Sequence, residues 1–148
     1  MVHSRLKKEG IDTIYASHAI LLVDGNYVLQ LRDNKSTISA GGKWSLFGGR
    51  INVRETPLDA IKREIGEELS LIPIEFRFLW RKEYCLEKKE TKVRAWFFVS
   101  DISSMWHEHT LLEGQDVGVF SFEEIKNLDM PFVIKKAIKH FHKRNKYA

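Results

Sequence analysis

The sequence predicts an α/β domain built on a mixed β-sheet, and three observations support this. Strand-like stretches rich in β-branched and apolar residues occur before, between and after stretches of helical periodicity. The chain of 148 residues has the length of one domain. Hydrophobic residues make up 43% and charged residues 30%, the balance of a globular protein with one core. We therefore expect residues 1–148 to form a single domain.

The N-terminal third of the chain is predicted to contain a β-hairpin. Residues 13–23 and 27–31 are both rich in apolar and β-branched types. The sequence Asp-Gly-Asn at 24–26 separates them, and these residue types favour tight hairpin turns. A polar loop over residues 33–43 then leads to the sequence WSLFGGRI.

The clearest helix is predicted over residues 57–69. Thr56 is a good N-cap, Pro57 suits the first helical position, and Asp59 forms a near capping box. Apolar residues at helical spacing form one stripe, which comprises Leu58, Ile61, Ile65 and Leu69. Pro73 prevents the helix from continuing further.

The remainder of the chain is predicted to return to the sheet and to end in helices. Two long strands are expected at residues 74–86 and 91–102. A loop at residues 103–114 and a short strand at residues 117–120 follow them. The polar segment EKKE connects the two long strands. A short helix opens with a capping pattern at Ser121, and a last helix follows Pro131 and extends to about residue 142.

The composition excludes several classes of protein. No apolar run approaches the roughly 20 residues of a transmembrane helix. The first residues, MVHSRLKKEGID, lack the apolar region of a secretory signal. Cys85 is the only cysteine, so neither an intrachain disulfide nor a cysteine-based zinc site can form. We therefore expect a cytoplasmic protein without a membrane partner.

The basic charge of the chain is concentrated in part near its end. The formal net charge is +4, and the sequence IKKAIKHFHKRNKYA contributes to it. A solvated helix face with cations near the helix C-terminus explains this cluster. The alternative is a surface that attracts nucleotides or RNA. We favour the first interpretation, because the run lacks the length and aromatic interleaving of a nucleic-acid groove. Nucleic acid is thus the less favoured partner, and an oligomer is compatible with the sequence.

Three glutamates gather on one side of the predicted helix. Glu64, Glu67 and Glu68 lie at i, i+3 and i+4 and span an arc of only about 100°. Arg63 is one cation for three carboxylates, and hard divalent cations prefer such oxygen ligands. A solvated acidic face is the plain alternative. The Gly-Gly pair at 48–49 favours the metal site, because a backbone carbonyl there can reach the same cation.

Segment 49–71 resembles the Nudix box, whose pattern is G-x5-E-x7-R-E-U-x-E-E-x-G-U, with U apolar. The matching positions are Gly49, Glu55, Arg63, Glu64, Ile65, Glu67, Glu68 and Leu71. Ser70 stands where the family has a glycine that normally ends the helix in a left-handed conformation. Phe47 is a second departure, at a position where many relatives carry proline.

The resemblance implies a fold, an activity and a set of site residues. The fold is an α/β/α sandwich with a mixed β-sheet, and most members hydrolyse a nucleoside diphosphate linked to another moiety, with Mg²⁺ or Mn²⁺. The implied metal ligands are Glu64, Glu67, Glu68 and the Gly48 carbonyl. Arg63 and Glu55 would orient these carboxylates through an ion pair. Water would then attack one phosphorus, and a carboxylate would take the proton.

The resemblance also suggests a general base and the substrate contacts. In the family the base is often a glutamate of the box or an acid on a later loop. Glu113, in LLEGQD, is the candidate for the later acid, although a plain turn residue explains it equally well. Arg32 and Gly49 are the expected substrate contacts. A surface ion pair is an equal alternative for Arg32.

The substrate is left open by these motifs. Members that act on ADP-ribose typically carry a proline soon after the box, but none lies between Pro73 and Pro131. The upstream motif of members that act on coenzyme A is incomplete. Nucleoside triphosphates, oxidised nucleotides and sugar nucleotides remain. Two other functions also remain: a non-catalytic Nudix-fold module that binds nucleotides or regulates, and pyrophosphohydrolysis at RNA 5′ ends.

Overall fold

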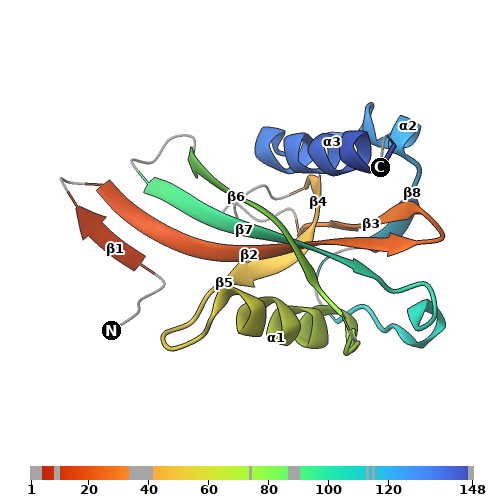
Figure 1. Cartoon of the computed structure of the whole chain (residues 1–148), viewed down its shortest axis with the longest axis horizontal. Helices are drawn as coiled ribbons and strands as arrows, with labels where there is room; N and C mark the ends of the chain where they lie inside the picture. The colour runs from red at the N-terminus through yellow and green to blue at the C-terminus, as the bar shows by residue number, and fades with distance from the viewer. Residues whose placement is uncertain are drawn as a thin grey trace.

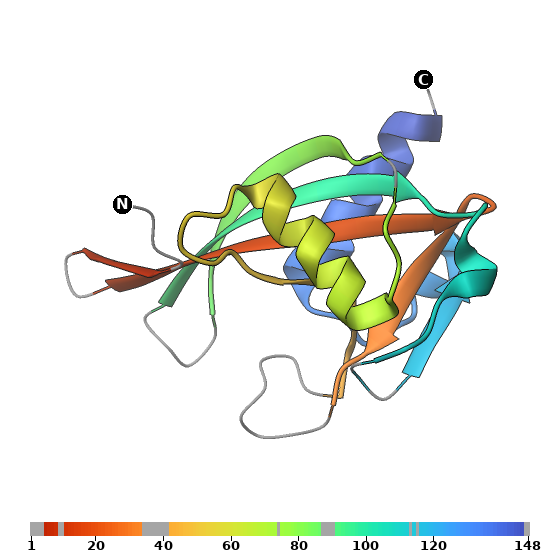
Figure 2. The same cartoon turned by 90° about the horizontal axis from the view of Figure 1, so that it is seen from below.

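The structure confirms the predicted α/β class. The computed structural model describes residues 5–8, 11–33, 42–73, 75–86, 91–112, 114 and 116–146. In this part of the chain, an eight-stranded sheet has α1 (Pro57–Leu69) on one face and α3 (Phe132–Lys146) on the other (Figure 1 and Figure 2). This layering is the α/β/α sandwich that the resemblance implies.

The long strand β2 (Ile11–Val23) lies at the centre of the sheet. It forms the predicted hairpin with β3 (Asn26–Leu31) and pairs in parallel with β7 (Thr91–Asp101). The other described strands pair antiparallel, so the sheet is mixed. These strands are β1 (Arg5–Lys8), β4 (Trp44–Ser45), β5 (Phe47–Arg50), β6 (Arg77–Cys85) and β8 (Asp116–Phe120).

Strand β5 contains the glycine pair of the sequence pattern. The sheet order is β4-β3-β2-β7-β6, with β1 and β5 also paired to β2, and β8 paired to β3. In the β2–β5 pairing, Gly48 lies opposite His18 and Gly49 lies opposite Ser17. The sequence did not predict this strand, because four residues that include two glycines have little strand propensity of their own. Pairing with β2 therefore fixes the glycines beneath α1.

Both faces of the sheet are buried, and alternate residues of β2 point to opposite sides. Ile14, Ala16 and Ile20 belong to the core that includes residues of α3. Ala19 and Leu21 belong to the core that includes residues of α1. This double burial explains why residues 13–23 form an almost continuous apolar stretch in the sequence.

Helix α1 begins and ends as the sequence predicts. The Thr56 hydroxyl accepts a hydrogen bond from the Asp59 N–H, and the Asp59 carboxylate accepts one from the Thr56 N–H, which completes a capping box. Ser70 adopts the left-handed conformation with φ 57° and ψ 35°, and its N–H donates to the Gly66 carbonyl at 3.0 Å. Ser70 thus preserves the cap geometry that the family normally builds with glycine, despite its Cβ.

Several other element boundaries differ from the prediction. Strand β6 begins at Arg77 rather than at 74, and α3 continues to Lys146 because its basic C-terminal residues are good helix formers. A 3₁₀ helix (Trp106–Glu108) lies within the predicted loop, and α2 (Phe122–Ile125) is the short helix that Ser121 caps. The EKKE connection falls outside the described residues. None of the helices in the described ranges has the length and apolar character needed to span a membrane.

Candidate active site

The glycine pair of β5 allows the carboxylates of α1 to approach the backbone closely. A Cβ atom at Gly48 would collide with the Ser17 carbonyl oxygen, which is the backbone of the neighbouring strand. A Cβ atom at Gly49 would instead collide with the carboxylate of Glu64. Glycine is therefore required at Gly48 by the sheet and at Gly49 by the position of Glu64.

Glu68 is a buried carboxylate held against the end of the sheet. Its exposed fraction is only 3%, and its Oε1 accepts a hydrogen bond from the Gly48 N–H at 3.0 Å. The Gln30 amide nitrogen lies 3.5 Å from Glu68 Oε2 and donates to the Leu46 carbonyl at 3.1 Å. The Leu112 N–H donates to the Glu68 backbone carbonyl at 2.9 Å. A buried carboxylate needs such donors, and here they also fix its orientation.

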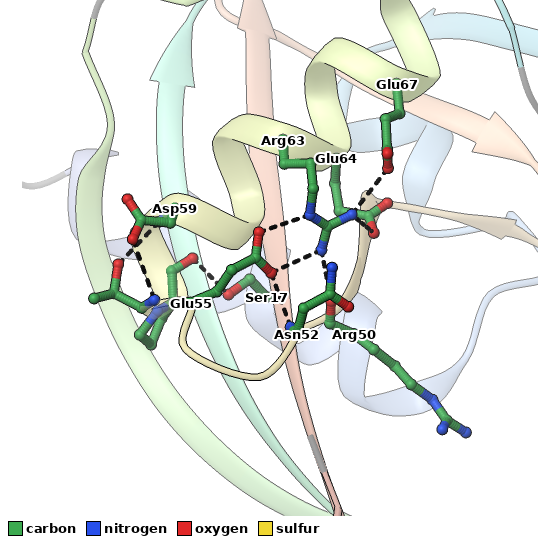
Figure 3. A network of polar contacts seen from close by, with 10 residues as sticks. Ser17, Arg50, Asn52, Glu55, Asp59, Arg63, Glu64 and Glu67 are labelled. Atoms are coloured by element: carbon green, nitrogen blue, oxygen red, sulfur yellow. Dashed lines mark hydrogen bonds and ion pairs between the residues drawn. The ribbon is translucent and has the colours of Figure 1, made fainter. Parts of the chain in front are cut away.

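Arg63 organises the other carboxylates of the site (Figure 3). Its Nε and Nη2 donate to the two oxygens of Glu55 at 2.7 and 3.0 Å, which is a bidentate ion pair. Its Nη1 donates to Glu64 Oε1 and to Glu67 Oε1, both at 2.9 Å. Its Nη2 also donates to the Arg50 carbonyl at 2.9 Å. These contacts use all the N–H groups of the guanidinium, so one residue links the loop, β5 and α1.

The Arg63–Glu55 pair stays ionised over a wide pH range. The hydrogen bond from Arg63 lowers the pKa of Glu55 below its usual value, and the Asn52 N–H, which donates at 2.8 Å, lowers it further against the opposing effect of burial. The same contact with Glu55, together with Glu64, raises the pKa of Arg63. The pair is therefore a fixed electrostatic support for the neighbouring glutamates and does not exchange protons near neutral pH.

The two carboxylates nearest the glycines open onto one cleft. Its volume is about 530 Å³, which lies in the range of small-molecule sites. The lining residues are Gln30, Arg32, Asp33, Gly48, Gly49, Arg50, Glu64, Glu68, Leu112 and Gly114. Three carboxylates and two guanidinium groups give this lining a formal net charge of −1. A second hollow, of about 370 Å³, lies beside Arg77 and Asp101 and contains none of the α1 carboxylates.

Arg32 has an unused hydrogen-bond donor at one side of the cleft. Its Nε is buried and has no partner among the described residues. Both ring nitrogens of nearby His18 are likewise buried without a partner there. Burial, with a further contribution from Arg32, lowers the pKa of His18 to about 4, so the imidazole is neutral at pH 7. Arg32 is therefore the cation at this position of the cleft lining.

The structure brings most of the sequence-predicted site residues together. Gly48, Gly49, Glu64, Glu68 and Arg32 line one cleft. Glu55 and Arg63 form the expected ion pair. The Glu67 side chain is 52% exposed and contacts Arg63, and Glu67 is not among the lining residues. Glu113 falls outside the described residues.

Two cleft residues, Gln30 and Arg50, were not singled out from the sequence. Gln30 is 3% exposed, and a buried amide in an otherwise apolar strand was a signal that could have identified it. Arg50 carried no local signal, because an arginine after a Gly-Gly pair is compatible with any surface loop. Its place in the cleft follows from the pairing of β5 with β2.

The donor set of the cleft fits a hard divalent cation. No three His, Cys, Asp or Glu side chains of the described ranges are arranged as a ready metal cage. Mg²⁺ does not need such a cage, because it keeps several waters and commonly uses one or two carboxylates together with substrate phosphates. Glu64 and Glu68, both in the cleft beside the Gly48 backbone, supply oxygen ligands of this kind.

The fold and the site together define a class of protein: an α/β/α sandwich in which a capped helix presents glutamates over a Gly-Gly strand. Comparison with known families identifies this class by name. The sequence matches the family described as NUDIX domain over residues 14–141. The chain belongs to the Nudix hydrolase family.

Solved structures with the same fold include proteins from several organisms. The MutT protein from Methanosarcina mazei Go1 has a TM-score of 0.77 and 24% identity, covering 90% of this chain and 96% of that one. The NUDIX domain of Shewanella oneidensis NrtR, complexed with ADP ribose, has a TM-score of 0.74 and 16% identity, covering 89% and 88%. The E. coli dihydroneopterin triphosphate pyrophosphohydrolase has a TM-score of 0.72 and 12% identity, covering 86% and 93%. A comparison with curated proteins found no match.

Proposed function

We propose that this protein is a divalent-metal-dependent pyrophosphohydrolase that cleaves a nucleoside diphosphate linked to another moiety. The proposed substrates are nucleoside triphosphates, oxidised nucleotides and sugar nucleotides. The observation that carries the proposal is the cleft in which Glu64 and Glu68 lie beside the Gly48–Gly49 backbone, with Arg32 at the side. Membership of the Nudix family supports the same reaction class.

The charge of the cleft explains why the reaction would need a cation. The lining carries a formal net charge of −1 and would repel a pyrophosphate by itself. Bound Mg²⁺ or Mn²⁺ supplies the positive charge that neutralises phosphate oxygens and lowers the pKa of a bound water. Glu64, Glu67, Glu68 and the Gly48 carbonyl are the proposed ligands.

The remaining residues have roles that follow from their contacts. Arg63 fixes Glu64 and Glu67, while Glu55 fixes Arg63. Arg32 would donate to a phosphate oxygen, because it lines the same cleft as the carboxylates. The proton from the attacking water would pass to a carboxylate, either a box glutamate or Glu113. Gly49 leaves room for the Glu64 carboxylate because it carries no side chain, and its backbone is a proposed substrate contact.

A substrate panel with a matched set of variants tests this function. The purified protein would be incubated with Mg²⁺ and nucleoside triphosphates, oxidised triphosphates or sugar nucleotides, and the nucleotide products identified. Glu68→Gln should lower kcat by at least about 10²-fold, because ligand charge and water activation are lost together. Glu123→Gln, at an exposed glutamate on α2, is the control and should leave kcat unchanged.

Metal binding is measured separately from turnover. Titration of the metal-free protein with Mn²⁺, followed by water proton relaxation, should show binding that is weakened in Glu67→Gln plus Glu68→Gln. Unchanged binding in the double variant would contradict the proposed ligands. Absence of turnover on every substrate, with intact Mn²⁺ binding, would contradict the hydrolase function.

A nucleotide-binding or regulatory module is the second candidate. The structural neighbour NrtR has a NUDIX domain solved with ADP ribose, and NrtR has also been solved with a 27mer DNA. ADP-ribose therefore belongs in the panel as both substrate and ligand. Saturable binding of ADP-ribose without any hydrolysis by the metal-loaded protein would favour this second function.

A further inference from the structure

We propose that Gln30 is a positioning residue of the active site, which fixes the carboxylate of Glu68 for metal binding. This inference rests on the proposed function, because Glu68 is a proposed metal ligand there. It goes further by assigning a role in turnover to an amide that acts through another residue. It is carried by the buried contacts of the Gln30 side chain.

Gln30 is an amide in a strand whose other buried residues are hydrophobic. The buried part of β3 comprises residues 27–30, and the three residues that precede Gln30 belong to the hydrophobic core. An amide that is buried without hydrogen-bond partners costs free energy, whereas an apolar side chain at the same position does not. Gln30 is therefore tolerated here only because its hydrogen bonds are formed, and the groups that they hold indicate its role.

The neighbours of Gln30 determine which end of its amide faces Glu68. The amide nitrogen Nε2 lies 3.1 Å from the Leu46 carbonyl oxygen and 3.5 Å from Glu68 Oε2. A backbone carbonyl oxygen and an ionised carboxylate can only accept hydrogen bonds. The two N–H groups of the amide can serve both acceptors, whereas the amide oxygen would be repelled by each of them. The nitrogen end therefore faces the carboxylate.

The two oxygens of Glu68 are held by donors from different strands. The Gly48 N–H donates to Oε1 at 3.0 Å, and Gln30 donates to Oε2. The pairing of β5 with β2 fixes Gly48, while Gln30 is paired on both sides, with Ser45 of β4 and Val117 of β8. The sheet therefore sets the rotation of a carboxylate that belongs to α1. Loss of the Gln30 donor would let the carboxylate turn away from the orientation that the metal needs.

The backbone at Gly114 covers the same amide. Gly114 has a φ of 90°, and a Cβ atom there would lie 3.1 Å from the Leu31 carbonyl oxygen and 3.2 Å from Gln30 Oε1. These distances are closer than an ordinary van der Waals contact, so glycine lets this segment pack directly on β3. The segment is also joined to α1, because the Leu112 N–H donates to the Glu68 carbonyl at 2.9 Å. This cover shields the amide–carboxylate contact from water and strengthens it.

The experiment is a double-mutant cycle in the full-length protein, with Gln30→Met, Glu68→Gln and the double variant. Methionine has nearly the length of glutamine but no N–H donor. Leu29→Met is the matched control, because Leu29 belongs to the core on the α3 side of the sheet and points to the opposite face from Gln30. Three quantities are measured: Mn²⁺ affinity of the substrate-free protein by water proton relaxation, kcat and KM at saturating Mg²⁺, and the midpoint of urea unfolding.

We expect Gln30→Met to weaken Mn²⁺ binding and to lower kcat, each by about 10- to 100-fold, the range for residues that orient a metal ligand. KM should change little, because the substrate contacts are untouched. The unfolding midpoint should stay the same or rise, because an apolar side chain avoids the cost of burying an amide. In the Glu68→Gln background, Gln30→Met should cause almost no further loss. Leu29→Met should behave as wild type in Mn²⁺ affinity and kcat.

Two results would overturn the inference while leaving the proposed function intact. Wild-type Mn²⁺ affinity and kcat in Gln30→Met would show that the amide only fills space, and additive losses in the double variant would show that it does not act through Glu68. Gln30→Asn withdraws the same amide by one methylene and should show the same losses, which keeps the test decisive if the methionine variant is less stable. Failure of the proposed function has a different signature: the wild type would hydrolyse no substrate, while Mn²⁺ affinity would still decide the role of Gln30.

Discussion

The substitution Arg63→Lys tests whether one guanidinium orients the carboxylates of the active site. Arg63 donates to Glu55, Glu64, Glu67 and the Arg50 carbonyl through five hydrogen bonds. Lysine keeps the positive charge but has three donors on one nitrogen and no planar fork. It cannot bind both oxygens of Glu55 while also reaching the helix glutamates. The substitution therefore isolates geometry from charge.

The expected magnitude follows from the hydrogen bonds that a lysine cannot make. At least two of the five must disappear, and bonds to charged groups contribute about 1.5–3 kcal/mol each when shielded from water. The Arg63 side chain is 27% exposed and that of Glu67 is 52% exposed, so solvent reduces this contribution. We expect the free energy of unfolding to fall by about 1–3 kcal/mol. Disordered ligands should lower kcat by about 10- to 100-fold.

Three measurements check this prediction: urea unfolding, Mn²⁺ affinity by water relaxation, and kcat with saturating Mg²⁺. A double-mutant cycle with Glu55→Gln adds specificity, because two residues that act through one ion pair should show non-additive effects on kcat. Lys62→Gln, at an exposed residue beside Arg63 on α1, is the control. If Arg63→Lys keeps kcat and Mn²⁺ affinity within about twofold of wild type, the guanidinium does not position the ligands, and the reasoning is refuted.

Three further predictions concern neighbouring groups. Glu113→Gln should lower kcat by about 10²- to 10⁴-fold if Glu113 is the general base. The Mn²⁺ affinity of this variant should change less than about threefold. Wild-type turnover across pH would assign the base to another carboxylate. Gly49→Ala should displace the Glu64 carboxylate that lies against it. Thermal unfolding should show a loss below about 1 kcal/mol, and kcat should fall about tenfold or more. Glu55 has a lowered pKa in the folded state, so its stabilising effect is complete above its unfolded pKa of about 4.3 and is lost as pH falls through the lower folded value. Glu55→Gln should therefore unfold with a shallower acid dependence of stability, and identical slopes would contradict that pKa shift.

The sequence by itself determined the elements whose signals are local. The strand over 13–23 and the helix over 57–69 depend on residue types and periodicity, and both match β2 and α1 closely. The capping box at Thr56 was readable because its two residues are only three apart. The arc of glutamates was equally readable, because helical geometry fixes which residues share a side.

The sequence pattern also indicated a role for Ser70 but could not establish its backbone conformation. Glycine at that position takes a left-handed conformation at little cost, whereas serine does so only when its surroundings compensate for the Cβ. In the structure its N–H bonds to Gly66, and the Thr110 N–H donates to the carbonyl of Leu69. The following loop thus holds the helix end in place, and such a contact involves residues that are distant in the sequence.

Only the tertiary structure decided how the cleft is built. Strand β5 exists because β2 supplies its hydrogen bonds, and this pairing sets Gly48 and Gly49 against the carboxylates of α1. Gln30 and Arg32 reach the same place from β3 and its end, although they precede the helix by more than twenty residues. Local propensity carries no information about contacts between such distant residues, because these contacts depend on strand register and on which face each side chain occupies. The sequence therefore determined which carboxylates the helix presents, and tertiary packing decided which cations face them across the cleft.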